Sequence, residues 1–372
     1  MELQPSLFAA QRPTPLGTVT RAPHPDLTEY DVIAVSDSGG KDSFAAMATT
    51  VNQARATGAA DRVFTFHASL GPLEWPSVDF GGRRYPSTGE LAALHSAGCG
   101  IPTERHIEVQ RTAQDAAGEL VPYHLLTYVA ERGMWPVRGD AQFCTGDWKT
   151  KRIFAAWTPI VRQLRPELGR PVRILNVLGL RAEESPDRAK RPAYRNVLTN
   201  GQRHVDEWLP IRDWTTKAVR ERCDESTVPH HWSYDSVPGA GDWLGSTRCS
   251  CSICIMGSRP DLILSARRRP RLTSLYAEVE QVRGHRFRQD LSIAELITMT
   301  KQRGGPAPGI VLADDEPEFE FMAAAVRTAL GQPPRRKLEV DPTAPRQLDL
   351  QGFGDCGACA RWEVTPGQGA SG

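Results

Sequence analysis

The sequence predicts an α/β protein with a doubly wound, mostly parallel sheet, because short apolar segments alternate with longer amphipathic segments from residue 30 onward. The apolar segments have the length of buried strands, and the segments between them are long enough for helices that connect parallel strands by right-handed crossovers. The chain of 372 residues is also long enough to bury a substantial core and to carry a second module.

The individual elements follow from this pattern. The predicted strands are residues 31–35, 62–67, 105–110 and 172–180, and the predicted helices among them are residues 42–58, 88–98 and 147–164. Beyond residue 260 the pattern becomes helical, and the last predicted helix is residues 317–331. We therefore divide the chain into a Pro-rich N-terminal arm (1–29), an α/β domain (30–240), a Cys-rich and helical region (241–332) and a flexible tail (333–372).

Composition limits the classes of protein to consider. Forty-five basic residues against 44 acidic residues leave almost no net charge, so no overall field indicates a nucleic-acid partner. The N-terminus has no signal-peptide pattern and no stretch of about 18 apolar residues occurs, so we expect a cytoplasmic protein without membrane association. In that compartment the eight cysteines are expected to be thiols, metal ligands or redox groups instead of disulfides.

One hexapeptide follows the first predicted strand and opens the first predicted helix: Ser38-Gly39-Gly40-Lys41-Asp42-Ser43. Such a loop directs several backbone N–H groups to one point, where the helix N-terminus adds partial positive charge and Lys41 adds a full charge. A Gly-Gly turn alone would need no ligand, but the whole hexapeptide at this junction predicts a phosphate site. The Walker A pattern is absent, because Asp42 follows Lys41 and no glycine lies five residues before the lysine.

Two other strand ends carry candidate ligands. His67 and Glu74 follow the second predicted strand, at the carboxyl edge where α/β sheets contact nucleotides, although a histidine there can be purely structural. Arg181 begins a mixed-charge run after the strand 172–180, and it is the best candidate in that run for binding an anion. The alternative interpretation is a solvated charged face.

The cysteines indicate a metal centre. Cys251 and Cys254 form a Cys-x2-Cys motif, with Cys249 just upstream and Cys144 before a predicted helix. Zinc would favour a second Cys-x2-Cys motif about 15 to 20 residues away, which is missing. We therefore favour a four-iron four-sulfur cluster on Cys144, Cys251 and Cys254, with the fourth iron bound by Cys249 or left open. Zinc and unligated thiols remain the alternatives.

The hexapeptide, "EWP", "FCTGDWKTKRI", "GLRAEES", "DEWLPIRDWT" and "CSCSICIMG" occur in this order between about residues 31 and 260. Together they resemble the adenine-nucleotide alpha-hydrolase (PP-loop, HUP-like) superfamily, and within it the PAPS reductase-like subfamily with the DndC and SspD type of DNA phosphorothioation proteins. The resemblance implies an ATP pyrophosphatase that adenylates a DNA backbone phosphate, so that sulfur from a cysteine desulfurase replaces an oxygen. It implies ATP, Mg²⁺ and a 4Fe-4S cluster as cofactors.

The resemblance also assigns roles to individual residues. It implies catalytic roles for Lys41, Asp42 and Ser43, with Asp42 capping the helix or holding Mg²⁺. The residues implied to bind the nucleotide are Ser36, Ser38, Gly39, Gly40, Lys41, Asp42, Ser43, His67, Glu74 and Arg181. An open iron of the cluster would bind a sulfide, whereas a closed site would organise the fold or transfer electrons.

The sequence departs from the sulfonucleotide reductases of the same superfamily. The tail contains Asp355-Cys356-Gly357 but lacks the Glu-Cys-Gly-Leu-His ending, and no Cys-Cys pair occurs. Cys356 and Cys359 could exchange a persulfide or disulfide, or the tail could be dispensable. The alternative functions are sulfonucleotide reduction, thiolation of tRNA or a small molecule, and a nucleotide-binding subunit without catalysis. The Arg-rich segments 265–271 and 333–340 are candidate DNA contacts, and a homodimer is compatible with the sequence.

Overall fold

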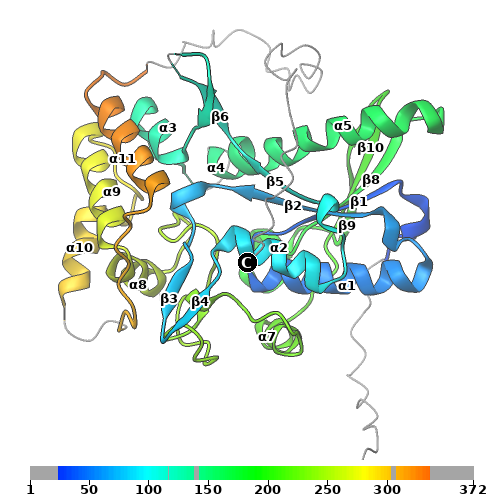
Figure 1. Ribbon diagram of the computed structural model, residues 1–372, viewed down its shortest axis with the longest axis horizontal. Helices are drawn as coiled ribbons and strands as arrows, with labels where there is room; N and C mark the ends of the chain where they lie inside the picture. The colour runs from blue at the N-terminus through cyan, green and yellow to red at the C-terminus, as the bar shows by residue number, and fades with distance from the viewer. Residues whose placement is uncertain (1–23, 116, 138–141, 303–306, 336–372) are drawn as a thin grey trace, which may run out of the picture.

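The computed structural model describes residues 24–115, 117–137, 142–302 and 307–335. These residues form an α/β fold around a six-stranded sheet with the strand order β5-β2-β1-β8-β10-β9 (Figure 1). Its strands are β1 (Val32–Ser36), β2 (Val63–Ser69), β5 (His106–Gln110), β8 (Val172–Val177), β9 (Tyr194–Thr199) and β10 (Arg203–Trp208). Neighbouring strands are parallel except β9 and β10, which are antiparallel. The predicted mostly parallel sheet is therefore confirmed.

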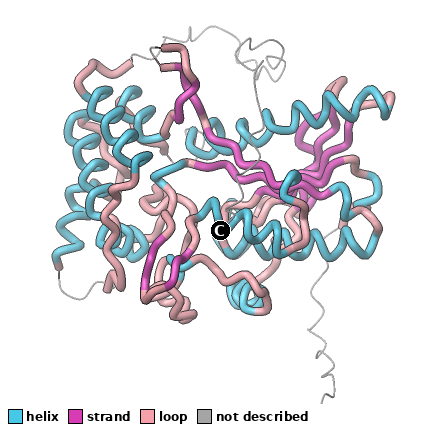
Figure 2. The backbone as a smooth tube through the Cα atoms, in the orientation of Figure 1, coloured by secondary structure: helices cyan, strands magenta, loops and turns pink. Residues whose placement is uncertain are grey.

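Helices cover both faces of this sheet (Figure 1, Figure 2). On one face lie α1 (Lys41–Thr57), α2 (Thr88–Gly98) and α7 (Thr216–Asp224), and on the other lies α5 (Lys151–Leu168). Side chains of β1 alternate between the two cores, as a strand buried on both faces requires. Ile33 and Val35 pack in the core on the α1 side, whereas Val32 and Ala34 pack in the core that contains Trp157 of α5.

The boundaries of the predicted elements shift by a few residues. The predicted helix 147–164 begins instead as α4 (Phe143–Thr145) and a π-helical turn (Gly146–Thr150), and then continues as α5. Short elements absent from the sequence prediction are β3 (Val78–Phe80), β4 (Arg83–Tyr85), β6 (Thr112–Gln114), β7 (Leu120–Pro122) and α6 (Pro186–Ala189). β3 pairs with β4 and β6 with β7, each as an antiparallel hairpin outside the main sheet.

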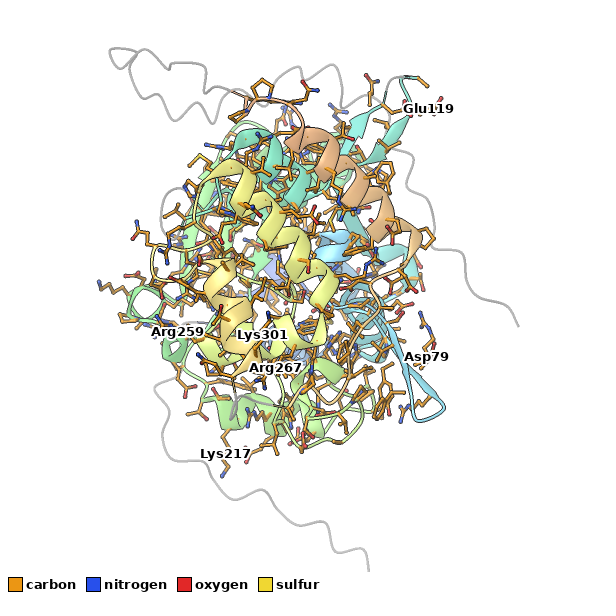
Figure 3. All side chains as sticks on the ribbon, turned by 90° about the vertical axis from the view of Figure 1, so that its left-hand side faces the viewer. Asp79, Glu119, Lys217, Arg259, Arg267 and Lys301 are labelled. Carbon is orange, nitrogen blue, oxygen red and sulfur yellow. The ribbon has the colours of Figure 1, made fainter. Side chains whose placement is uncertain are left out.

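A helical region packs beside one edge of the α/β part, and Figure 3 views the molecule from that side. Its helices are α3 (Leu125–Arg132), α8 (Arg259–Arg268), α9 (Pro270–Arg283), α10 (Ile293–Lys301) and α11 (Pro317–Leu330). Leu126 and Val129 of α3 share one core with Met322 and Val326 of α11. The helical region therefore includes a helix from inside the segment 30–240, in addition to the predicted helices after residue 260.

The ends of the described chain bear on two further predictions. Leu27 is completely buried in the α1-side core, so packed structure begins inside the segment predicted as an arm. Cys356, Cys359 and nearly all of the predicted tail lie outside the described residues. Within the described ranges, no helix combines the length and the apolar character that crossing a membrane requires.

Candidate functional site

The loop between β1 and α1 lies at the topological switch point of the sheet. β1 pairs with β2 on one side and with β8 on the other. The strands of this sheet that come next along the chain, β2 and β5, lie on one side of β1, and the later strands β8, β10 and β9 lie on the other side. Open α/β sheets bind ligands at the carboxyl end of strands at such a point. The loop comprises residues 37–40, and Gly40 is the N-cap residue of α1.

Gly39 lets this loop pass close to the start of α2. Its φ of 67° lies in the left-handed region, and a Cβ atom there would come within 2.3 Å of the Thr88 carbonyl oxygen. Only glycine combines this backbone conformation with so little space. The two glycines predicted as part of a phosphate loop therefore have a steric role as well, because Gly39 fixes the loop against α2.

The loop amides divide into two groups. Three already have acceptors: Ser38 N–H donates to Ser43 Oγ (3.2 Å), Gly39 N–H to Asp37 Oδ1 (2.9 Å) and Lys41 N–H to the Tyr234 hydroxyl (3.1 Å). In the described part of the chain, no atom accepts a hydrogen bond from the amides of Gly40, Asp42 or Ser43. The latter group offers donors at the positive end of α1, where an anion is stabilised.

Asp37, which the sequence analysis did not single out, fixes the conformation of the loop through hydrogen bonds to its carboxylate. Its Oδ1 also accepts the Ser43 hydroxyl at 2.7 Å, and its Oδ2 lies 3.4 Å from His95 Nδ1. Burial favours the neutral acid, but His95, Ser43 and Gly39 together outweigh it and hold the pKa of Asp37 below its usual value. An Asp two residues before a Gly is a signal for such a turn, and it could have been recognised in the sequence.

Lys41, Asp42 and Arg181 form a compact charge cluster beside the loop. Lys41 Nζ lies 2.9 Å from Asp42 Oδ2, and Arg181 Nε lies 2.5 Å from Asp42 Oδ1. Burial raises the pKa of Asp42, but the two cations outweigh this effect and lower it overall. Arg181 is thus brought to the loop, as expected.

The prediction that Asp42 caps α1 is wrong, because Gly40 is the N-cap residue and no side chain makes the cap hydrogen bond. Asp42 instead joins α1 to the segment after β8. This approach is close, since a Cβ atom on Gly179 would lie 2.5 Å from the Asp42 carbonyl oxygen. To contribute to Mg²⁺ binding, Asp42 would first have to release one of its two cations.

Tyr234 is a further site residue that the sequence analysis missed. Its hydroxyl oxygen accepts the Lys41 N–H, and the centre of its ring lies 5.2 Å from Lys41 Nζ. A Cβ atom on Gly40 would lie 3.1 Å from its hydroxyl oxygen. Tyr234 comes from a short 3₁₀ helix, Trp232–Tyr234, far along the chain, and no local pattern connects it with the loop.

His67 and Glu74 are buried and contact each other, so the structure does not place them as direct contacts of a nucleotide at the loop amides, which corrects their predicted role. His67 Nε2 lies 3.2 Å from Glu74 Oε2 and His67 Nδ1 lies 2.9 Å from the Asp37 carbonyl oxygen. Both side chains are buried. Burial lowers the pKa of His67, but the Glu74 charge outweighs burial and raises it to about 9. Ser36, which was also predicted to bind the nucleotide, is the last residue of β1 and precedes the loop.

Three of the four predicted metal ligands, Cys144, Cys251 and Cys254, lie in one part of the structure and affect one another's pKa. Cys251 and Cys254 are hydrogen-bonded to each other, which lowers the pKa of Cys254, and Cys144 lies near enough for Cys254 to raise its pKa in addition to burial. Lys149 from the π-helical turn carries its charge close to all three sulfur atoms. As whole residues, all three cysteines are half-buried.

Cys249 is not brought to this group. Ser250 has a φ of 97° and turns the chain sharply between Cys249 and Cys251. Cys249 Sγ lies 3.8 Å from Thr88 Oγ1, and a Cβ atom on Gly40 would lie 3.6 Å from Cys249 Cβ. Burial raises the pKa of its thiol to about 12. Cys249 therefore belongs to the surroundings of the loop, a separation that spacing alone cannot show.

The three remaining cysteines suit a sulfur-ligated centre chemically, since thiolates are the ligands of iron–sulfur clusters and Lys149 balances their charge. Within the described ranges, no three His, Cys, Asp or Glu side chains are grouped so that they could hold a metal ion. The choice between a 4Fe-4S cluster and zinc stays a prediction.

The Arg-rich segment 265–271 is not a free cationic surface. Arg268 and Arg269 are completely or almost completely buried. Arg268 donates to the carbonyl oxygens of Ser233 and Asp235, and Arg269 pairs with Asp314. The prediction that this run contacts DNA is therefore wrong for its two central arginines. Of the segment 333–340, the structure describes only residues 333–335.

Comparison with known proteins adds no assignment: a scan against protein-family models and a search of curated proteins both give no match. The function is therefore inferred from the geometry of the site.

Proposed function

We propose that the protein is an ATP pyrophosphatase of the PP-loop type that adenylates a phosphate group, so that sulfur can then replace one of its oxygens. One observation carries the proposal. The loop at the switch point offers the amides of Gly40, Asp42 and Ser43, which have no acceptor among the described residues, next to the buried cations Lys41 and Arg181. Amides and cations held in place in this way stabilise the charge that develops on a departing pyrophosphate.

Asp42 keeps the two cations ready for this role. Both Lys41 and Arg181 share its carboxylate, so an arriving phosphate replaces Asp42 as the anionic partner of these cations and leaves the Asp42 carboxylate available to a metal cation. Mg²⁺, when bound, would neutralise phosphate oxygens, with Asp42 as the protein ligand. Asp37 and Ser43 hold the loop in shape throughout.

The sulfur chemistry rests on the cysteines and on the resemblance. Cys144, Cys251 and Cys254 would hold the 4Fe-4S cluster, which would supply an open iron for a sulfide. The resemblance implies the DNA backbone as acceptor and a cysteine desulfurase as sulfur donor. Because Arg268 and Arg269 are buried, DNA would have to contact other surfaces of the protein.

Pyrophosphate release from ATP tests the proposal. Lys41→Ala is expected to lower the rate by at least about 100-fold, the usual cost of one electrostatic contact to the transition state. Lys217→Ala is the matched control, because Lys217 is exposed on α7 and, among the described residues, forms an ion pair with Glu221 alone. Undiminished release by Lys41→Ala contradicts the proposal. Sulfite production from PAPS would indicate a reductase instead, and ATP binding without turnover would indicate a non-catalytic subunit.

A further inference from the structure

A continuous set of polar contacts runs from the loop of residues 37–40 to Lys149, whose charge acts on the three-cysteine group of Cys144, Cys251 and Cys254. The Asp37 carbonyl oxygen accepts from His67 Nδ1 (2.9 Å), and His67 Nε2 faces Glu74 Oε2 (3.2 Å). The other oxygen of Glu74 accepts from Ser250 Oγ (3.3 Å), which in turn accepts from Lys149 Nζ (2.6 Å). Lys149 is a cation close enough to interact with the sulfur atoms of Cys144, Cys251 and Cys254. Except for the pair His67 and Glu74, each contact joins residues that are far apart in the chain.

The geometry at His67 identifies its charge state. Both ring nitrogens face oxygen atoms, a carbonyl oxygen on one side and a Glu74 carboxyl oxygen on the other. Burial raises the pKa of Glu74, but its charged and hydrogen-bonding neighbours outweigh burial and lower it, so Glu74 is the carboxylate and both ring nitrogens carry protons. His67 is 1% exposed and Glu74 is 5% exposed. A positive charge therefore lies buried beneath the backbone of the loop, held by one carboxylate.

Glu74 also holds the cysteine segment through the backbone. It forms an isolated antiparallel bridge with Cys251, and Ser252 N–H donates to the Leu73 carbonyl oxygen at 2.9 Å. Ser250, which lies between Cys249 and Cys251, has a φ of 97°. A residue with a side chain adopts such a backbone conformation only when its surroundings impose it. Its hydroxyl contacts to Glu74 and Lys149 are those surroundings.

We propose that His67, Glu74 and Ser250 are positioning residues that couple the phosphate loop to the three-cysteine group. A triphosphate on the loop attracts the His67 cation away from Glu74. The hydrogen bond from Ser250 Oγ to Glu74 then weakens, and the backbone turn at Ser250 that precedes Cys251 becomes less constrained. Since coupling between two sites is reciprocal, occupancy of the cysteines changes nucleotide affinity by the same factor. This inference rests on the proposed nucleotide site.

The test measures how fast iodoacetamide alkylates Cys144, Cys251 and Cys254 in the full-length protein, followed by peptide mass spectrometry. The rate is compared with and without α,β-methylene-ATP, which cannot be cleaved between its α and β phosphates. In the wild type the nucleotide is expected to change the rate about fivefold or more. Glu74→Gln and Ser250→Ala should reduce this change to less than about twofold, while both variants still bind the nucleotide.

Glu108→Gln is the matched control, because Glu108 also acts on the charge of His67 but makes no contact with Ser250. It should keep the full response. Ser250→Ala removes only a hydroxyl, so it tests the coupling even if Glu74→Gln fails to fold. If the wild type does not bind the nucleotide, the proposed function and the coupling both fall. If it binds with no change in alkylation, or if the two variants respond like wild type, the coupling alone is overturned.

Discussion

Tyr234 has one hydrogen-bonding capacity that the folded loop does not use. Its hydroxyl oxygen accepts the Lys41 N–H, which leaves the hydroxyl proton to donate to a phosphate. Tyr234→Phe keeps the ring beside Lys41 and removes only this group. We expect the KM for ATP to rise about tenfold and the free energy of unfolding to fall by about 1–3 kcal/mol, because a buried amide loses its acceptor. Steady-state kinetics and urea denaturation measure the two effects.

Tyr194→Phe is the control for that variant. Its hydroxyl donates to Asp206 at the far edge of the sheet, so stability should fall while the KM for ATP stays the same. Equal KM values in the two variants would contradict the role assigned to Tyr234.

His67 should make stability depend on pH in a particular direction. Burial opposes its charge, but Glu74 raises the pKa of His67 to about 9, above the value of about 6.5 in an unfolded chain. A raised folded-state pKa stabilises the fold fully below about pH 6.5, and this contribution disappears as the pH rises through about 9. The free energy of unfolding of the wild type should therefore fall, relative to His67→Gln, by about 2–3 kcal/mol across that interval. Parallel stability curves from denaturation at several pH values would show that His67 carries no such charge.

At the scale of elements, the contact between the loop and α2 depends on one glycine. Gly39 and Gly58 both have positive φ values, 67° and 73°, so alanine should strain the backbone similarly at both positions, by about 1 kcal/mol. Only at Gly39 does a Cβ atom collide with another element, whereas nothing lies within 4 Å at Gly58. Gly39→Ala should abolish nucleotide binding and Gly58→Ala should preserve it, as calorimetric titration with ATP would measure. Similar affinities of the two variants for ATP would mean that the loop can shift away from α2 without losing the nucleotide.

Which elements the sequence predicted depends on where their partners lie. β1, β2 and β8 are mostly apolar and mostly buried, so the residues themselves indicate burial, whereas in β5 only Val109 is buried. β10 was missed because it carries Asp206 and Glu207, which are buried but satisfied by partners from other segments. Tyr30 and Tyr194 donate to Asp206, and Arg191 and Arg195 pair with Glu207. A buried carboxylate of this kind looks like a surface residue until its partners are known.

At the scale of the whole molecule, a part of the site could be predicted when its residues are adjacent in the chain, and could not be predicted when its partners come from distant segments. The hexapeptide was recognisable because its donors are adjacent in the chain. Tyr234, Lys149 and the separation of Cys249 from Cys251 depend on contacts between distant segments. The mutual pairing of His67 and Glu74 was missed although both residues were singled out, since spacing does not reveal whether two side chains face a ligand or each other.

The helical region should matter for activity through Arg269. This buried side chain pairs with Asp314 through Nε and Nη2, and its Nη1 donates to the Glu74 carbonyl oxygen at 2.6 Å and to Ser252 Oγ at 3.0 Å. Arg269→Lys keeps one charge but cannot reproduce these contacts, because lysine lacks the planar fork. We expect a loss of about 1–3 kcal/mol of stability and, at temperatures where the variant is folded, slower pyrophosphate release.

Arg327 provides the matched comparison, since it also contacts a carboxylate, Glu278, through Nε and Nη2, but on the exposed surface of α11. Arg327→Lys should change the free energy of unfolding by less than about 1 kcal/mol and leave the rate unchanged. If both substitutions slow the reaction equally, or if Arg269→Lys lowers stability without affecting the rate, the helical region supports the fold alone. A selective loss of rate in Arg269→Lys would mean that its packing maintains the position of Glu74, and through Glu74 the distance between the loop and the cysteines.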